Sequence, residues 1–103
     1  MDILSTAVDF DWDRVNRSKC QKHGIGVDVI ESFFGGNFIV LPDEGHSQKE
    51  RRFRAIGWVN ERPMFVVFTL RHHGNDVLIR PISARYMHKK EIDIYEKEEA
   101  PDL

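Results

Sequence analysis

The sequence has little of what marks secreted, membrane or zinc-stabilised proteins. A single cysteine, Cys20, occurs in 103 residues, which excludes an internal disulfide and a cysteine-based zinc site. No apolar run approaches the roughly 18 residues that a membrane span needs. Residues 1–13 have neither the basic start nor the long apolar stretch of a signal peptide. We therefore expect a cytoplasmic protein that makes no membrane contact.

Several chemical motifs are missing as well. There is no GxGxxG, no P-loop and no HExxH, so nothing supports a nucleotide-binding fold or a zinc protease. His72 and His73 are adjacent and point apart, and no spaced carboxylate or cysteine completes a metal site. Cys20 lies between lysines that could lower its pKa, yet no Cys-His-Asn pattern accompanies it. We expect a packed or surface thiol, no metal and no cofactor.

The aromatic content is high enough for a packed core. Seven Phe, two Trp and two Tyr, with 41% hydrophobic residues, exclude a chain that is disordered throughout. The length is that of one common domain. We therefore predict a single domain over residues 1–103, with residues 1–9 as an N-terminal extension and residues 99–103 as a flexible acidic tail.

The net charge of −2 hides an uneven distribution. Residues 1–13 carry −4, residues 14–90 carry +7 and residues 91–103 carry −5. A basic body between acidic ends is compatible with nucleic-acid binding, and equally with ordinary surface charge that is biased toward helix ends.

Residue spacing predicts two short helices, four strands and a closing helix. Asp13 is a good N-cap for a helix through about Lys22. Residues 27–34 place their apolar side chains at helical spacing, and residues 87–99 are expected to form the last helix. The expected strands are residues 38–41, 51–59, 64–71 and 77–85.

Strands joined by short turns pair as an antiparallel meander. We therefore predict an α+β fold in which a four-stranded antiparallel sheet has one face covered by the three helices. Phe53 and Ala55 alternate with Arg52 and Arg54, so the two pairs lie on opposite faces. Pro81 inside the last strand implies an edge, a bulge or a change of face.

Arginines inside strands are the least expected feature. They are Arg52, Arg54, Arg71, Arg80 and Arg85. Arginine fits a strand only on an open face, and a guanidinium binds phosphate through two parallel hydrogen bonds without losing its charge. Several on one face would form a groove for an RNA backbone. Alternatively, they solvate the outer face of the sheet or pair with nearby acids, namely Glu50, Glu61 and Asp76.

Metal-free RNA cleavage needs a base for the ribose 2′-hydroxyl, cations for the charged transition state and an acid for the leaving oxygen. Arginines can supply the cations, and imidazoles that titrate near neutrality can move the protons. The candidates are His23, His46, His88, Tyr86 and Tyr95. Each histidine also has a structural explanation at a helix end or in a loop.

Six motifs follow one another from residue 10 to about residue 98. They are FDWD (10–13), KHG (22–24), PDEGHSQKERRFRAIG (42–57), VVFTLR (66–71), IRPISAR (79–85) and KKEIDIYEKE (89–98). Their order and spacing resemble the BrnT toxins of bacterial type II toxin–antitoxin systems, a branch of the RelE-like ribonucleases. The resemblance implies a RelE-like α+β fold with a central antiparallel sheet, and metal-independent endoribonuclease activity.

The resemblance also implies site residues. The recurring polar positions of the family fall on His23, His46, Arg52, Thr69, Arg71, Arg80, Ser83, Arg85, Glu91 and Tyr95. The resulting hypothesis gives catalytic roles to Arg71, Arg85, Arg80, His23 and His46. It assigns RNA contacts to Arg52, Arg54, Thr69 and Ser83. In this hypothesis Arg71 and Arg85 clamp the scissile phosphate.

The implied partners are an RNA substrate and a cognate antitoxin of the ribbon-helix-helix type, which could form a heterotetramer with the toxin. Operator DNA would be reached only through the antitoxin. Two other functions stay open. One is a non-catalytic module that binds an antitoxin-like partner through the same basic face. The other is direct DNA binding, which the lack of a helix-turn-helix disfavours.

The acidic ends suggest one more hypothesis. Asp9, Asp11 and Asp13 lie at the start of the first helix, and residues 96–99 lie on the last helix. Either group could screen the basic face until RNA or the antitoxin arrives.

Overall fold

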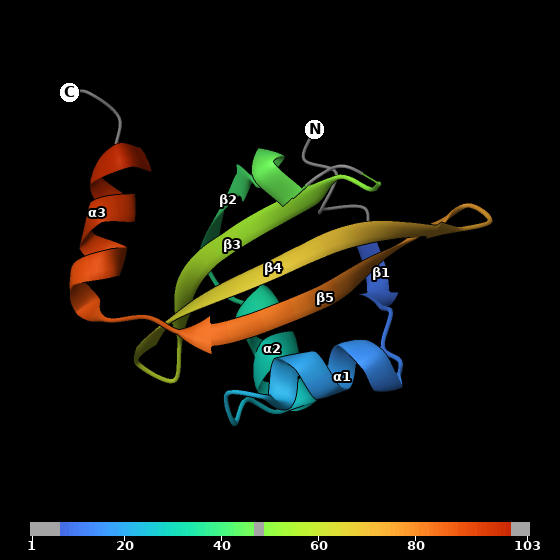
Figure 1. Ribbon diagram of the computed structural model, residues 1–103, viewed down its shortest axis with the longest axis horizontal. Helices are drawn as coiled ribbons and strands as arrows, with labels where there is room; N and C mark the ends of the chain where they lie inside the picture. The colour runs from blue at the N-terminus through green and yellow to red at the C-terminus, as the bar shows by residue number, and fades with distance from the viewer. Residues whose placement is uncertain (1–6, 47–48, 100–103) are drawn as a thin grey trace.

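The computed structural model describes residues 7–46 and 49–99, which form an α+β fold around one five-stranded sheet (Figure 1). The elements are β1 (Ala7–Phe10), α1 (Arg14–Gln21), α2 (Val27–Phe34), β2 (Phe38–Pro42), the 3₁₀ helix η2 (Glu44–His46), β3 (Arg52–Val59), β4 (Arg62–His73), β5 (Asp76–Tyr86) and α3 (Lys89–Glu99). No helix in this described part is long and apolar enough to cross a membrane. The predicted acidic tail lies outside the described residues, apart from Glu99, the last residue of α3.

The predicted meander is confirmed for β2 to β5, which pair antiparallel in chain order. The prediction of four strands is wrong, because β1 pairs with β5 in parallel and makes the sheet mixed. The expected N-terminal extension therefore contributes residues 7–9 to the sheet. Strand β1 has only four residues and its partner lies at the far end of the chain. Local alternation in the sequence cannot reveal such a pairing.

The first helix begins where the sequence predicts. The Asp13 carboxylate accepts hydrogen bonds from the backbone N–H groups of Val15 (2.9 Å) and Asn16 (3.0 Å), and the Asn16 side-chain oxygen accepts one from the Asp13 N–H (2.7 Å). This capping box satisfies donors that the first turn leaves unpaired. The buried Asn16 amide also donates to the carbonyls of Asp11 (2.9 Å) and Pro81 (2.8 Å). It thereby fastens α1 to β5.

Helices α1 and α2 cover one face of the sheet (Figure 1). The core on this face includes Ile30 and Phe33 of α2, together with Ala55, Val66 and Phe68 of the sheet. The alternation predicted for β3 is confirmed, because Ala55 packs in this core.

The third helix is not part of this layer, so the prediction that all three helices cover one face is wrong. Ile92 of α3 and the neighbouring Met87 are buried against Ile56, on the face that carries the strand arginines. Phe65 and Tyr95 pack against the same small cluster. Figure 1 shows α3 at one end of the sheet, apart from α1 and α2. Ile56 and Phe65 interrupt the arginines of this face and give α3 an apolar surface to dock on.

Pro81 marks a bulge, one of the three outcomes that the sequence left open. The pairing of β4 with β5 moves from Val67 opposite Ser83 to Phe68 opposite Pro81, so Ile82 is an extra residue. Strand β5 lies inside the sheet, between β1 and β4. The extra residue shifts the alternation by one. As a result Arg80 and Ser83, which are three residues apart, project from the same face.

Replacing Asn16 tests how α1 is fastened to the sheet. The Asn16→Ala substitution leaves the buried carbonyl of Pro81 without its donor and removes half of the capping box. We expect the free energy of unfolding to fall by about 1–3 kcal/mol, measured by urea denaturation. Ser18→Ala, at an exposed position of the same helix, is the matched control and should change it little. Equal effects of the two substitutions would contradict this role of Asn16.

Candidate functional site

The arginine face is the sheet face opposite α1 and α2. Its residues form rows across β3, β4 and β5. The rows are Arg52–Thr69–Arg80, Arg54–Val67–Ser83 and Ile56–Phe65–Arg85, and Arg71 lies one row beyond, opposite Leu78. Seven of the nine predicted site residues therefore share one face, with His23 and His46 as the exceptions.

A hollow of about 400 Å³ opens on this face. It is lined by Asp43, Arg52, Arg54, Phe65, Val67, Ile82 and Ser83. The apolar floor comes from β4 and the bulge, and the two arginines come from the neighbouring strand β3. Cations beside an apolar floor suit a ligand that has both a phosphate and a flat, apolar part.

Arg54 is incompletely hydrogen-bonded. One of its terminal nitrogens donates to the Pro42 carbonyl at 3.2 Å. Its Nε–H group is buried and has no hydrogen-bond partner among the described residues. A buried charged donor without an acceptor carries a free-energy cost. Arg54 also lines the hollow, so its guanidinium adds positive charge there.

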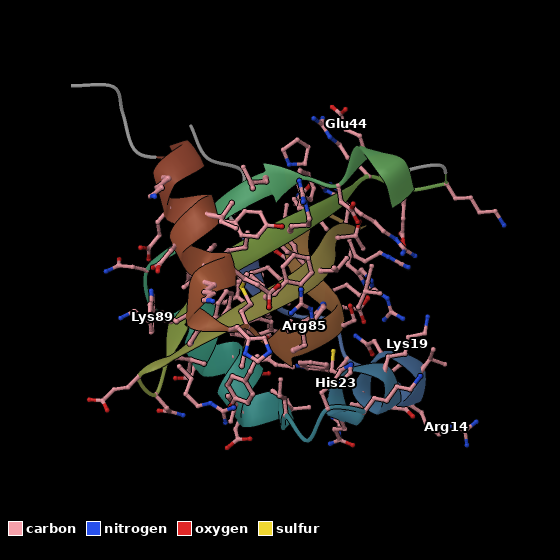
Figure 2. The ribbon with its side chains drawn as sticks, turned by 60° about the vertical axis from the view of Figure 1, so that its left-hand side comes forward. Arg14, Lys19, His23, Glu44, Arg85 and Lys89 are labelled. Carbon is pink, nitrogen blue, oxygen red and sulfur yellow. The ribbon has the colours of Figure 1, made fainter. Side chains whose placement is uncertain are left out.

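Arg85 lies next to the hollow, opposite Phe65. Its two terminal nitrogens donate to the two carboxylate oxygens of Glu91 at 3.3 and 3.0 Å, and its guanidinium lies 5.0 Å from the centre of the Phe65 ring. Figure 2 shows Arg85 beside the first turn of α3, where Lys89 is labelled. This fork of two bonds fixes the direction of the guanidinium.

Glu91 is shared between the arginine face and α3. Besides Arg85, it accepts a hydrogen bond from the backbone N–H of His88 at 3.1 Å. The hydrogen bond from Arg85 is the main cause that lowers the pKa of Glu91, and the His88 N–H adds to it. Glu91 is therefore ionised at neutral pH, and Arg85 stays oriented.

Two further arginines of the face pair with carboxylates. Arg80 lies 3.0 Å from Asp13 and 3.6 Å from Asp11, and only 13% of its side chain is exposed. Arg71 lies 3.3 Å from Glu50, one of the acids that the sequence analysis named as alternative partners of the strand arginines. The Asp13 pKa is lowered chiefly by the Asn16 backbone N–H and further by Arg80. The acidic N-terminal segment thus contacts the arginine face at Arg80.

Thr69 is on the same face but has a structural partner. Its side chain is 2% exposed and its hydroxyl donates to the Arg51 carbonyl at 2.6 Å. This bond holds the chain just before β3, where Arg52 begins the strand. Thr69 therefore positions the backbone beside Arg52.

The histidines lie elsewhere. His23 is exposed in the loop between α1 and α2, the elements that cover the other face. His46 ends η2, which follows Asp43 at the wall of the hollow, and its side chain lies outside the described residues. His88 contributes its backbone N–H to Glu91.

Asp43 was missed by the sequence analysis. It lines the hollow, and its backbone N–H donates to the Arg52 carbonyl at 3.0 Å. The available signal was its place directly after the end of β2, where the chain leaves the sheet beside the arginines of β3.

Cysteine chemistry and metal binding have no geometric support in the described residues. Cys20 is fully buried, as a packed thiol should be, and burial raises its pKa to about 11. The thiol is therefore protonated at neutral pH and is a poor nucleophile. In residues 7–46 and 49–99, no three His, Cys, Asp or Glu side chains gather as metal ligands would.

The Glu91–Arg85 pair predicts a pH dependence. Because the folded-state pKa of Glu91 is lowered from 4.5, its stabilising effect is present above that value and is lost as pH falls through the folded pKa. We expect the protein to be more stable than its Glu91→Gln variant at neutral pH, with the difference disappearing in acid. Denaturant midpoints over a pH series measure this. Glu44→Gln, at an exposed position in η2, is the control, and a difference of constant size would contradict the pairing.

Comparison with known proteins supplies a second kind of observation. Residues 12–91 match the model of a family described as "Ribonuclease toxin, BrnT, of type II toxin-antitoxin system". The match covers most of the chain and contains the whole arginine face, and it confirms the resemblance seen in the sequence motifs. No individual curated protein matches the chain.

Proposed function

Because the chain belongs to the BrnT family of ribonuclease toxins of type II toxin–antitoxin systems, we propose that it cleaves RNA on the arginine face without a metal ion. The observation that carries this proposal is the hollow, where Arg52, Arg54 and Ser83 meet over an apolar floor with Arg85 in the next row. These groups can bind a phosphate, and the floor can accept a ribose or a base.

The proposed reaction is an attack of the ribose 2′-oxygen on the adjacent phosphorus. A base removes the 2′-hydroxyl proton, the bond from phosphorus to the 5′-oxygen breaks, and an acid protonates that oxygen. The products are a 2′,3′-cyclic phosphate and a free 5′-hydroxyl. Negative charge gathers on the phosphorane-like transition state, so prearranged cationic donors lower the barrier most.

The arginines divide into two groups in this proposal. Arg54 and Arg85 stabilise the reacting phosphate, because Arg54 lines the hollow and Arg85 is held in a fixed direction beside it by Glu91. Arg80 and Arg71 lie in the rows toward the turn between β4 and β5 and hold the flanking RNA backbone. The proposal therefore differs from the sequence-based one, in which Arg71 shared the scissile phosphate with Arg85.

Substitution of the central arginines tests the catalytic proposal. Arg54→Gln and Arg85→Gln should each lower kcat about 10²- to 10³-fold, because each removes donors to the transition state. The assay follows cleavage of RNA by the purified protein in the presence of EDTA, which should leave the activity of the unsubstituted protein intact. Arg62→Gln is the control, because Arg62 stacks on Tyr86 at 3.6 Å on the opposite face.

The same variants distinguish a face that cleaves RNA from one that only binds the antitoxin. We propose that a cognate antitoxin of the ribbon-helix-helix type neutralises the toxin, and that operator DNA is reached only through it. A catalytic face loses RNA cleavage in the Arg54 and Arg85 variants and keeps the antitoxin, whereas a non-catalytic module loses the antitoxin. Loss of antitoxin binding with no RNA cleavage by the unsubstituted protein would overturn the enzyme proposal.

His46 is the proposed proton carrier. Its backbone ends η2, the short helix that follows the wall residue Asp43. We expect His46→Gln to lower the cleavage rate about 10²- to 10⁴-fold and to remove one limb of the pH–rate profile between about pH 5 and 8. His72→Gln, at an exposed position of β4, is the matched control. An unchanged pH profile in His46→Gln would assign the proton transfer to another group.

A further inference from the structure

The exposed side of α1 is strongly basic and plays no part in the proposed site. Arg14, Arg17, Lys19 and Lys22 fall within nine residues, and residues 14–23 contain no acid. All four side chains are exposed. None has an ion pair or a side-chain hydrogen bond with any described residue. Arg71, Arg80 and Arg85 of the sheet, by contrast, are paired with carboxylates.

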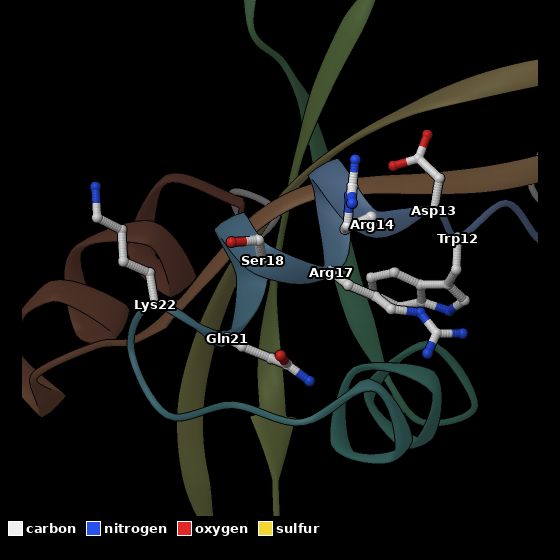
Figure 3. Close-up of a pocket in the computed structure, with 7 residues that line it drawn as sticks. All are labelled: Trp12, Asp13, Arg14, Arg17, Ser18, Gln21 and Lys22. Atoms are coloured by element: carbon white, nitrogen blue, oxygen red, sulfur yellow. The ribbon is translucent and has the colours of Figure 1, made fainter.

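Three of these cations, Arg14, Arg17 and Lys22, border a second, broader hollow. It is lined by Trp12, Asp13, Arg14, Arg17, Ser18, Gln21 and Lys22. Figure 3 shows these side chains along α1 and the residues that flank it, with Trp12 and Lys22 at opposite ends. The indole N–H of Trp12 donates to Glu31 at 2.9 Å, which fixes the ring at the rim of the hollow. The basic helix side is thus completed by an oriented aromatic ring.

The spacing suits a polyanion. Arg14, Arg17 or Ser18, and Gln21 or Lys22 recur every three or four residues, so they form one stripe along the helix. At 1.5 Å per residue the stripe is roughly 12 Å long. That is the length of about three to four nucleotides at 3.4 Å per phosphate of one strand. Cations that follow a backbone beside an aromatic ring are the usual means of binding single-stranded nucleic acid.

The stripe begins beside a residue that contacts the arginine face. Asp13 caps α1 and also pairs with Arg80 at 3.0 Å, and Arg14 is the next residue. The two basic surfaces are therefore linked at Asp13, whose carboxylate lies between Arg80 and the start of α1.

We propose that the exposed side of α1 is a second RNA-binding surface that holds single-stranded substrate beyond the cleavage hollow. The inference rests on the proposed ribonuclease function for the identity of the polyanion. Trp12 packs partly against the core and lines the hollow beside the unpaired cations, and an aromatic ring on which a base can stack favours single-stranded RNA over an acidic protein segment.

The test removes the charge and keeps the helix. The triple variant Arg14→Gln/Arg17→Gln/Lys22→Gln uses a residue of similar helix propensity. The matched control Lys89→Gln/Lys90→Gln/Lys97→Gln removes the same charge from exposed positions of α3. Binding of a 2′-O-methylated RNA of about 20 nucleotides, which cannot be cleaved, is measured between about 50 and 300 mM salt. Each phosphate contact contributes about 0.7 to the slope of the logarithm of the binding constant against the logarithm of the salt concentration. Because the α1 variant lacks three cations, its slope should be smaller by about 2, and it should bind about ten-fold more weakly at low salt.

Two further measurements locate the bound strand. In a Trp58→Phe background, added RNA should quench the fluorescence of Trp12, whereas inorganic polyphosphate should bind without quenching. In cleavage assays the α1 variant should show a raised KM for long RNA, with kcat unchanged and with cleavage of a dinucleotide unaffected.

The outcomes are separable. A reduced slope in the α1 variant of a protein that cleaves no RNA would support this surface and overturn the proposed catalysis. Any of four results would overturn the α1 proposal. They are an equal loss of salt slope in the α1 and α3 variants, an unchanged slope in the α1 variant, absent Trp12 quenching, and failure of the unsubstituted protein to bind RNA. So would an α1 variant that binds RNA normally but loses an acidic partner protein.

Discussion

One extra residue in β5 determines the character of the arginine face. If β5 continued the regular ladder past Ser83, Ile82 would pair with Phe68 and Arg80 with Leu70, and the alternation would direct Arg80 toward the core, where a guanidinium is costly to bury. With the bulge, Arg80, Ser83 and Arg85 lie on the same side of the sheet, and Ile82 itself joins the lining of the hollow. The carbonyl of Pro81 at the bulge accepts the Asn16 amide, so the irregularity also anchors α1. Fold and candidate site share this constraint.

The second organising feature is that arginines of the sheet are held by carboxylates from other elements. Asp11 and Asp13 hold Arg80, and Glu91 holds Arg85. Such pairs near water contribute little to stability. They do fix the guanidinium groups in one arrangement, which is what a site that stabilises developing charge requires. On α1 the basic side chains have no such partners among the described residues. Both surfaces are rich in cations, but only the arginine face has cations that are paired with carboxylates.

Local pattern predicted much of this structure. The Asp13 cap, the helix over 27–34, the alternation of β3 and the four-strand meander are confirmed, because each depends on neighbours in the chain. The pairing of β1 with β5 and the position of α3 were not predicted, because they depend on contacts between distant segments. The bulge was one of three outcomes for Pro81, and only the pairing partner could decide among them. Asp43 was missed for the same reason, since its neighbours in space come from β3 to β5.

Glu91 couples two equilibria, namely ligand binding at Arg85 and the docking of α3 on the sheet. Its carboxylate accepts hydrogen bonds from Arg85 and from the backbone of His88, where α3 begins. A ligand that takes both donors of Arg85 therefore changes the stability of the first turn of α3. By thermodynamic reciprocity, the docking of α3 on Ile56 changes the affinity of Arg85 for that ligand by the same factor. The last helix is thus energetically coupled to whatever anion the sheet binds.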